Sequence, residues 1–173
     1  MTNALPRNVI LAGFMGSGKT TVGKLLAARL GWQFVDTDEL IERRAGRAVA
    51  EIFRAQGEAA FRQWESEVAE GLATMERCVI ATGGGFMLRP ENRAAAEAAG
   101  MVVFLMASPE EIWHRVRGGA GRPLLEGEDP RRRIRELLDQ RQAAYQALPI
   151  CIDTDRRTPE AVAEAIWARL VSG

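Results

Sequence analysis

The sequence predicts an α/β fold: a three-layer α/β/α sandwich built on a five-stranded parallel sheet. Five short apolar runs alternate with stretches of helical length and helical spacing. Strands separated by helices need crossover connections, which make the strands parallel and put helices on both faces of the sheet. With 173 residues, 47% of them hydrophobic, the chain has the size and composition of one globular domain. We therefore expect a single domain over residues 1–173.

The first half of the chain predicts two strands and three helical segments. The apolar run at 9–12 is the first strand, and apolar residues at helical spacing predict a helix over 19–30 that a glycine ends. A second strand follows at 33–36. Helix-rich segments at 36–44 and 49–73 come next, and a glycine inside the second segment marks a break.

The second half predicts the remaining three strands and four helices. The strands are the apolar runs at 78–82, 101–106 and 150–153. The helices are expected at 90–99, from Ser108 to about Arg117, at 131–148 and from Thr158 onward. Ser-Pro-Glu and Thr-Pro-Glu open two of these helices, with the N-cap residue and the proline at their preferred positions. Between two of the helices, residues 118–130 are rich in glycine, proline and acids, which predicts a mobile loop.

Composition excludes several classes of protein. Basic and acidic residues number 23 each, which argues against general nucleic-acid binding. No stretch approaches the roughly 20 apolar residues of a membrane span, and no targeting segment is apparent, so we expect a cytoplasmic protein. The single histidine, His114, cannot form a histidine-rich metal site. The two cysteines, Cys78 and Cys151, lie in apolar runs and are expected to be buried strand thiols.

A phosphate-binding motif lies between the first strand and the first helix. The segment 13–20 reads GFMGSGKT and fits G-x-x-x-x-G-K-[ST]. Its backbone N–H groups and the helix N-terminus suit a phosphate, Lys19 reaches the β- and γ-phosphates, and the Thr20 hydroxyl suits Mg²⁺. The alternative is a glycine-rich turn with an incidental lysine, but only two of the 23 basic residues are lysines. The motif therefore predicts a nucleotide site.

Two acids follow the second strand. Asp36 and Asp38 are expected next to the phosphate loop if the two strands end at the same sheet edge. Their spacing suits one carboxylate directed at the metal's water and one at a substrate hydroxyl. A structural alternative is that Asp36 and Glu39 form a capping box.

Two further features suit either a binding site or ordinary structure. Gly83, Gly84 and Gly85 follow the third strand, where glycines let a ligand touch the backbone of an α/β protein, although a plain turn would look the same. Arg62 and Glu65 lie three residues apart on one helical face. Taken alone, this pair is better explained as a surface ion pair.

Together these residues resemble the shikimate kinase family over nearly the whole chain. The segments that carry the resemblance are 13–21, 34–38, Ile52-Phe53, Gly57-Glu58, Phe61-Arg62 with Glu65, 83–85, 122–125 (RPLL), Arg141 with Tyr145, and 153–157. The resemblance implies a P-loop kinase fold and the ATP-dependent phosphorylation of the 3-hydroxyl of shikimate, a step of chorismate and aromatic amino acid biosynthesis. It also implies Mg²⁺ as cofactor, a substrate-binding region at 33–73 and a lid at 114–130.

The resemblance also implies residue roles. Catalysis falls to Lys19, Asp38 and the lid arginine, Arg122. The implied ATP-binding residues are Gly16, Ser17, Gly18, Lys19, Thr20, Thr21, Arg115, Arg122 and Arg157, with Arg115 and Arg157 flanking the adenine. The implied shikimate-binding residues are Asp38, Arg62, Gly83, Gly84, Gly85 and Arg141, and the implied metal residues are Thr20 and Asp36.

Two other functions remain open from the sequence. Another small-molecule P-loop kinase, such as a gluconate kinase, would have the same phosphate loop but gives no reason for Arg62 and Arg141 to converge with Gly84. A non-catalytic nucleotide-binding module of the same fold should have lost Lys19, Asp38 or the lid arginine. We expect a monomer that binds ATP and shikimate, with no nucleic-acid or membrane partner.

Overall fold

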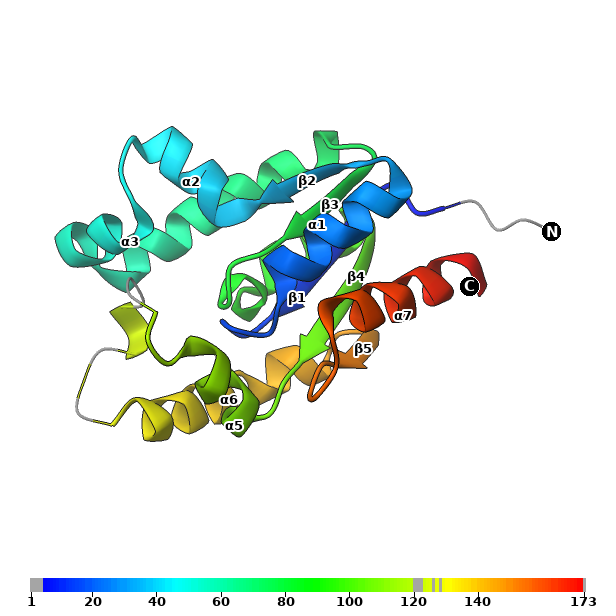
Figure 1. Cartoon of the computed structure of the whole chain (residues 1–173). Coiled ribbons are helices and arrows are strands. Elements are labelled where there is room, and N and C mark those ends of the chain that lie inside the picture. Colours follow the sequence, from blue (N-terminus) through cyan, green and yellow to red (C-terminus); the bar gives the residue numbers. More distant parts are fainter. Residues whose placement is uncertain (1–4, 120–122, 126, 128, 173) are drawn as a thin grey trace.

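The computed structural model describes residues 5–119, 123–125, 127 and 129–172. Its centre is a parallel sheet of five strands, in the order β2-β3-β1-β4-β5 (Figure 1). The strands are β1 (Val9–Gly13), β2 (Gln33–Asp36), β3 (Cys78–Ala81), β4 (Met101–Met106) and β5 (Ile150–Asp153). The predicted five-stranded parallel sheet is confirmed.

Helices cover both faces of this sheet, so the predicted three-layer sandwich is also confirmed. One face carries α1 (Lys19–Leu30) and α7 (Pro159–Ser172), which pack against each other. The opposite face carries α3 (Val49–Gly71), α4 (Pro90–Ala99) and α6 (Pro130–Gln146). The remaining helices are α2 (Thr37–Ala45) and α5 (Pro109–Val116), with short 3₁₀ turns η1 (Leu72–Thr74), η2 (Phe86–Leu88) and η3 (Pro123–Leu125). None of the helices in the described part of the chain is long and apolar enough to span a membrane.

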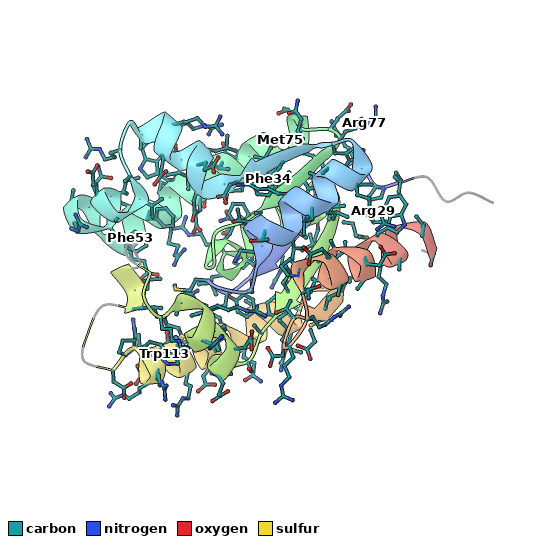
Figure 2. All side chains as sticks on the ribbon, viewed as in Figure 1. Arg29, Phe34, Phe53, Met75, Arg77 and Trp113 are labelled. Atoms are coloured by element: carbon teal, nitrogen blue, oxygen red, sulfur yellow. The ribbon has the colours of Figure 1, made fainter. Side chains whose placement is uncertain are left out.

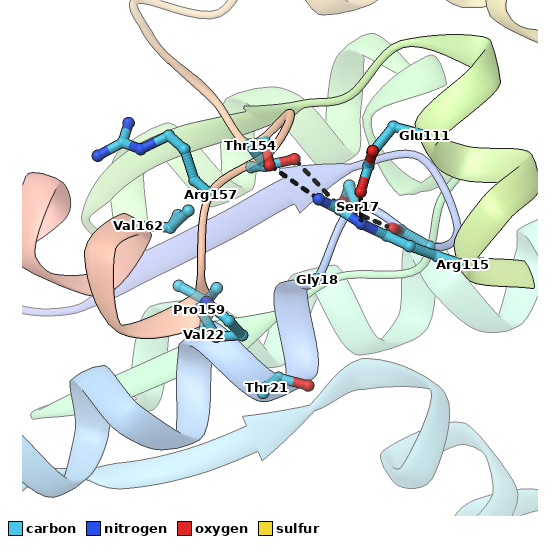
Figure 3. Close-up of a pocket in the computed structure, with 11 residues that line it drawn as sticks. Ser17, Gly18, Thr21, Val22, Glu111, Arg115, Thr154, Arg157, Pro159 and Val162 are labelled. Atoms are coloured by element: carbon cyan, nitrogen blue, oxygen red, sulfur yellow. Dashed lines mark hydrogen bonds and ion pairs between the residues drawn. The ribbon is translucent and has the colours of Figure 1, made fainter.

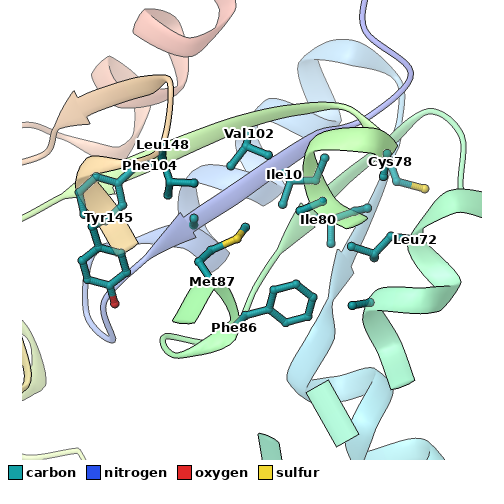
Figure 4. Close-up of a cluster of buried hydrophobic side chains, with 14 residues drawn as sticks. Ile10, Leu72, Cys78, Ile80, Phe86, Met87, Val102, Phe104, Tyr145 and Leu148 are labelled. Carbon is teal, nitrogen blue, oxygen red and sulfur yellow. The ribbon is translucent and has the colours of Figure 1, made fainter. Parts of the chain in front are cut away.

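Alternation along the strands divides the core into two clusters. In β1, Ile10 and Ala12 face the α3, α4 and α6 side, whereas Val9 and Leu11 face α1 and α7. Successive side chains of a strand point to opposite faces, and all four of these are fully buried. Figure 4 shows the first cluster, in which Phe104 of β4 lies beside the ring of Tyr145 from α6. A fully apolar central strand is thus buried on both sides, as the sequence indicates.

Helix α3 breaks at Gly57, as the sequence predicts. The backbone there has φ 82° and ψ 176°, a conformation that favours glycine, so the helical segment bends and then continues to Gly71. A third cluster formed by Ile41, Ile52, Phe61 and Val68 packs α2 against both parts of α3. This packing fixes the part of α3 that carries Arg62 and Glu65.

Two expectations need correction. Cys78 is buried, but Cys151 is exposed because β5 is the edge strand of the sheet. The helical segment was expected to start at Asp36, but Asp36 is the N-cap that precedes α2. Its side chain accepts a hydrogen bond from the Asp38 backbone N–H (2.9 Å). The structural alternative for Asp36 is therefore confirmed only as an N-cap, since its bond is to Asp38 and not part of a capping box with Glu39. The cap leaves the second carboxylate oxygen of Asp36 available for another contact.

Within the described part of 118–130, the short turn η3 packs on the rest of the protein. Leu125 is buried in a cluster with Phe14, Ile112 and Ile134. The Arg133 Nε donates a hydrogen bond to the Leu124 carbonyl (3.3 Å), which ties η3 to α6. The predicted mobility of the whole loop stays a prediction, because 120–122, 126 and 128 lie outside the described residues.

The close packing of α1 on the sheet generates a stability prediction. A Cβ atom at Gly23 would lie 2.6 Å from the ring of Phe34, which Figure 2 places beside α1, and 3.2 Å from Leu11. Overpacking costs about 1–3 kcal/mol, which exceeds the ~1 kcal/mol that alanine gains in helix propensity. We expect Gly23→Ala to lower the melting temperature.

The control is Gly71→Ala at the end of α3, where the nearest atom, Arg44 Nη2, would lie 3.6 Å from the new Cβ. This variant should melt at or above the wild-type temperature. If Gly23→Ala also melted at or above that temperature, the close approach of α1 to Phe34 would be wrong.

Candidate functional site

The loop between β1 and α1 has the backbone of a phosphate cradle. Gly16 (φ 77°) and Gly18 (φ 95°) adopt the left-handed conformation that lets successive N–H groups turn toward one point, and Gly18 is the N-cap of α1. A cavity of about 380 Å³ opens beside this loop (Figure 3). It is lined by Gly16, Ser17, Gly18, Thr21, Val22, Glu111, Arg115, Thr154, Arg157, Pro159 and Val162. Six of the implied ATP-binding residues therefore meet in one cavity.

Arg115 joins three parts of this cavity wall. Its guanidinium donates to the Gly16 carbonyl (3.2 Å) and to both the hydroxyl (3.1 Å) and the carbonyl (2.8 Å) of Thr154. Its Nε pairs with Glu111 at 2.8 Å. These contacts hold α5, the phosphate loop and the segment after β5 together, so Arg115 holds the cavity wall together in addition to any contact with a ligand.

Arg157 lines the same cavity but is held differently. Its guanidinium donates to the carbonyl oxygens of Asp153 (3.2 Å) and Ala161 (2.9 Å), both exposed contacts. In Figure 3 this guanidinium points away from Ser17 and Gly18. Its side chain therefore stands at the outer rim of the cavity.

Lys19 lies against the phosphate loop itself. Its Nζ donates to the carbonyl oxygens of Gly13 (2.8 Å) and Phe14 (2.9 Å). Burial lowers the pKa of Lys19 to about 8, although Asp38 and Asp36 nearby oppose this shift. Burial thus disfavours the charged ammonium, and a further anion beside it, in addition to the two carboxylates, would favour the charged form.

Thr20 and Asp36 form the pair that suits a magnesium ion. The Thr20 hydroxyl donates to Asp36 Oδ2 (3.3 Å), so a hydroxyl and a carboxylate oxygen lie side by side at the start of α1. Mg²⁺ prefers such oxygen ligands and takes few of them from the protein. The two residues fit the metal that the sequence predicts.

A second cavity, of about 220 Å³, collects all six implied shikimate-binding residues. Asp38, Arg62, Gly83, Gly84, Gly85 and Arg141 line it, together with Met15, Val49, Phe53, Phe61 and Leu124. These residues come from α2, α3, α6, η3 and the two loops that follow β1 and β3. Parallel strands place these loops at one sheet edge, where α/β proteins bind ligands.

The Arg62–Glu65 pair is a buried ion pair, which corrects the expectation of a surface contact. Arg62 Nη1 lies 2.7 Å from Glu65 Oε2, and both residues are buried. Arg62 Nη2 also pairs with Glu58 at 2.8 Å, and the Glu58 side chain is half-exposed. Burial alone would lower the pKa of Arg62, but the carboxylates of Glu65 and Glu58 raise it, so the guanidinium stays charged.

Two buried carboxylate oxygens face the backbone of Gly83. Asp38 Oδ1 and Glu65 Oε1 find no hydrogen-bond partner among the described residues. A Cβ atom at Gly83 would lie 2.8 Å from the first and 2.6 Å from the second. Burial raises the pKa of Asp38 to about 7, and Asp36 and Glu65 add to this shift. Buried acceptors need hydrogen-bond donors, and a ligand in the neighbouring cavity could supply them.

Several residues of the two cavities had been assigned no role in a site from the sequence. Thr154, Pro159 and Glu111 belong to the nucleotide side, and Glu58 pairs with Arg62 on the other side. The polar residues after β5 were a signal for the first group, since they follow the carboxyl end of a parallel strand. The predicted catalytic residue Arg122 lies outside the described residues.

Comparisons with known proteins point to one family. The family model for shikimate kinase matches residues 15–171. A shikimate kinase from Symbiobacterium thermophilum is 51% identical over 166 residues, which cover 94% of this chain and 95% of the relative. A solved shikimate kinase from Acinetobacter baumannii, in complex with shikimate, is 36% identical with a TM-score of 0.92, covering 96% of this chain and 93% of that one.

The gluconate kinase alternative finds only a likeness of fold. A gluconokinase from Sinorhizobium meliloti has a TM-score of 0.60 and 21% identity, covering 98% of this chain and 96% of that one. This neighbour shows a shared fold and no more.

The raised pKa of Asp38 generates a prediction about stability. The pKa of this carboxyl is about 7 in the folded protein, against an ordinary value of 3.8 in the unfolded chain. Between these pH values the folded state therefore binds more protons than the unfolded state. The free energy of unfolding therefore falls as pH rises through this window. Asp38→Asn removes this effect, and the ligand-free variant should melt several degrees above wild type at about pH 8 and by less at about pH 5.

Thermal melts at the two pH values test this expectation. Glu97→Gln, which changes an exposed acid on α4, should match wild type at both. If Asp38→Asn were no more stable than wild type at the higher pH, the ionised Asp38 carboxylate would not destabilise the folded protein, and the prediction would be wrong.

Proposed function

The chain belongs to the shikimate kinase family, and from this premise we propose how its residues perform the family's reaction. It transfers the γ-phosphoryl group of ATP to the 3-hydroxyl of shikimate and gives shikimate 3-phosphate and ADP. The reaction is a step of chorismate and aromatic amino acid biosynthesis. The observation that carries the assignment of residues is the meeting of all six implied acceptor residues in one cavity beside the phosphate loop.

Arg62 and Arg141 bind the acceptor's carboxylate. Both guanidinium groups line the cavity, and a planar guanidinium can hold a carboxylate with two parallel hydrogen bonds. Arg62 already forms ion pairs with two carboxylates. The Glu58 side chain is half-exposed, whereas the Glu65 side chain is fully buried. Glu58 is therefore the side chain that gives way to the carboxylate of shikimate.

Asp38 accepts the hydrogen bond of the reacting hydroxyl. Its Oδ1 is buried without a donor among the described residues and lies beside Gly83, in the wall of the acceptor cavity. With a pKa of about 7, the carboxylate can take up a proton at neutral pH as the hydroxyl attacks phosphorus. Glu65 Oε1, which lies beside the same Gly83 backbone, accepts a hydrogen bond from a second hydroxyl of the ring.

The nucleotide occupies the first cavity. Backbone N–H groups of Gly16 and Gly18, with the N-terminus of α1, bind the phosphates. Ser17 lines the cavity between them, and its own N–H donates to the Phe14 carbonyl (3.1 Å). Lys19 leaves its contacts with the loop carbonyls and neutralises the charge on the transferred phosphoryl group, which is the main demand of this reaction. Arg115, Arg157 and Thr21 contact the rest of the nucleotide, and Arg122 contacts the transferred phosphoryl group from the lid.

Thr20 and Asp36 hold Mg²⁺ when the nucleotide is bound. Their adjacent oxygens fit the ion, and Asp36 also caps α2, which fixes the direction of its carboxylate. The metal neutralises phosphate charge in such reactions. Asp36 thus links the metal position to the start of the helix that carries Asp38.

The chain works as one functional unit over residues 1–173. Residues 33–73 supply most of the acceptor cavity and 114–130 form the lid, with Leu124 already in the cavity wall. We propose that it acts as a monomer in the cytoplasm, where ATP is available.

A coupled assay of ADP release tests the proposed function. ADP should form at a high rate with shikimate and Mg²⁺ and at background rate with gluconate or a nucleoside monophosphate. Equal rates with gluconate, or no dependence on shikimate, would contradict the assignment.

Arg62→Lys tests the acceptor site. The variant keeps the charge but loses the planar fork, so the KM for shikimate should rise at least about tenfold while the KM for ATP changes little. Arg54→Lys, an exposed change on the same helix, is the control and should behave as wild type. A wild-type KM in Arg62→Lys would mean that Arg62 serves only its ion pairs.

A further inference from the structure

The carbonyl oxygen of Gly84 accepts two hydrogen bonds from one helix. The Tyr145 hydroxyl donates to it at 2.7 Å and Arg141 Nη1 at 3.1 Å. Arg141 and Tyr145 are four residues apart on α6, so they share one face of that helix. A carbonyl oxygen has two lone pairs, and each of these donors takes one.

Packing fixes the Tyr145 hydroxyl in place. The side chain is buried, and its ring stacks on Phe104 of β4 with the ring centres 4.6 Å apart (Figure 4). Burial also raises the pKa of Tyr145, so the phenol stays protonated and remains a donor at neutral pH. The ring needs no hydroxyl to stack, since phenylalanine would pack in the same way. The hydroxyl is thus explained by its contacts with Gly84 and Arg141.

The position of the Arg141 guanidinium depends on the Gly84 carbonyl, whereas that of Arg62 is fixed by ion pairs. Arg62 is held between two carboxylates, but Arg141 makes no ion pair with any described residue. Its position rests on the hydrogen bond to Gly84, on a side-chain hydrogen bond with Tyr145, and on the ring of Phe14, 5.2 Å from the guanidinium carbon. With the Tyr145 hydroxyl on one lone pair of Gly84, the guanidinium is confined to the other.

We propose that Tyr145 is a positioning residue for the acceptor's carboxylate: its hydroxyl holds the Gly84 carbonyl, and that carbonyl aims Arg141 into the acceptor cavity. The inference rests on the proposed function, because it takes the carboxylate of shikimate as the ligand of Arg141. Tyr145 itself does not line that cavity, so its effect is exerted through Gly84 and Arg141.

Tyr145→Phe is the direct test, since it keeps the ring stack and removes the hydroxyl, with the hydrogen bond that it donates to Gly84. The dissociation constant and the KM for shikimate should rise about threefold to tenfold, which corresponds to the loss of one such hydrogen bond. The KM for ATP and kcat should stay within about twofold. Ile166→Val on α7, which removes one buried methyl group on the opposite face of the sheet, controls for a general loss of stability and should keep the wild-type KM.

A neutral ligand separates positioning from a structural role. The carboxamide of shikimate has no charge for Arg141 to bind, so its dissociation constant, measured by calorimetry, should be the same for wild type and Tyr145→Phe. An equal loss of affinity for the acid and the amide, or no loss for the acid, would overturn the proposal.

A double-mutant cycle supplies an independent measurement. In an Arg141→Lys background, Tyr145→Phe should change the affinity for shikimate by less than about twofold, because the group it aims is gone. A full threefold to tenfold loss in that background would also overturn the proposal. If the wild-type enzyme phosphorylates shikimate and Tyr145→Phe has the same affinity for it, this inference alone is refuted. If the wild-type enzyme is inactive on shikimate, the proposed function is refuted.

Discussion

The acceptor cavity depends on three consecutive residues without side chains at the carboxyl end of β3. A Cβ atom at Gly83 would lie 2.6 Å from Glu65 Oε1 and 2.8 Å from Asp38 Oδ1, and one at Gly85 would overlap the Arg62 guanidinium. Polar groups from α2 and α3 therefore occupy space that any other residue would fill. The parallel sheet places this backbone beside the phosphate loop, so acceptor and donor meet at one edge.

Packing charged groups this closely has an electrostatic cost in the ligand-free protein. Burial raises the pKa of Asp38 to about 7 and lowers that of Lys19 to about 8, so each is held in an environment that disfavours its charge. Bound phosphates would favour the charged ammonium, and a hydroxyl would give Asp38 the donor that it lacks. The site is thus organised for its ligands at the expense of stability, as is common for functional sites.

Local patterns predicted most of the fold and the nucleotide loop, because strand and helix periodicity and the phosphate motif are set by residues close in sequence. The strand order and the exposure of Cys151 were not predictable in this way, since they depend on which strand lies at the edge. The Arg62–Glu65 pair has the same spacing on a surface as in a pocket, and its burial against Gly83 and Gly85, which are distant in sequence, distinguishes the two. Tyr145 left no signal beyond the resemblance, because its partner is a backbone carbonyl 61 residues away.

The central claim is that one cavity orients shikimate by its carboxylate and presents its 3-hydroxyl to Asp38. A crystal structure of the protein with ADP, Mg²⁺ and shikimate tests this most directly. The account predicts the carboxylate within hydrogen-bond distance of both Arg62 and Arg141, and the 3-hydroxyl within that distance of Asp38. A carboxylate bound away from both guanidinium groups, or a 3-hydroxyl remote from Asp38, would contradict it.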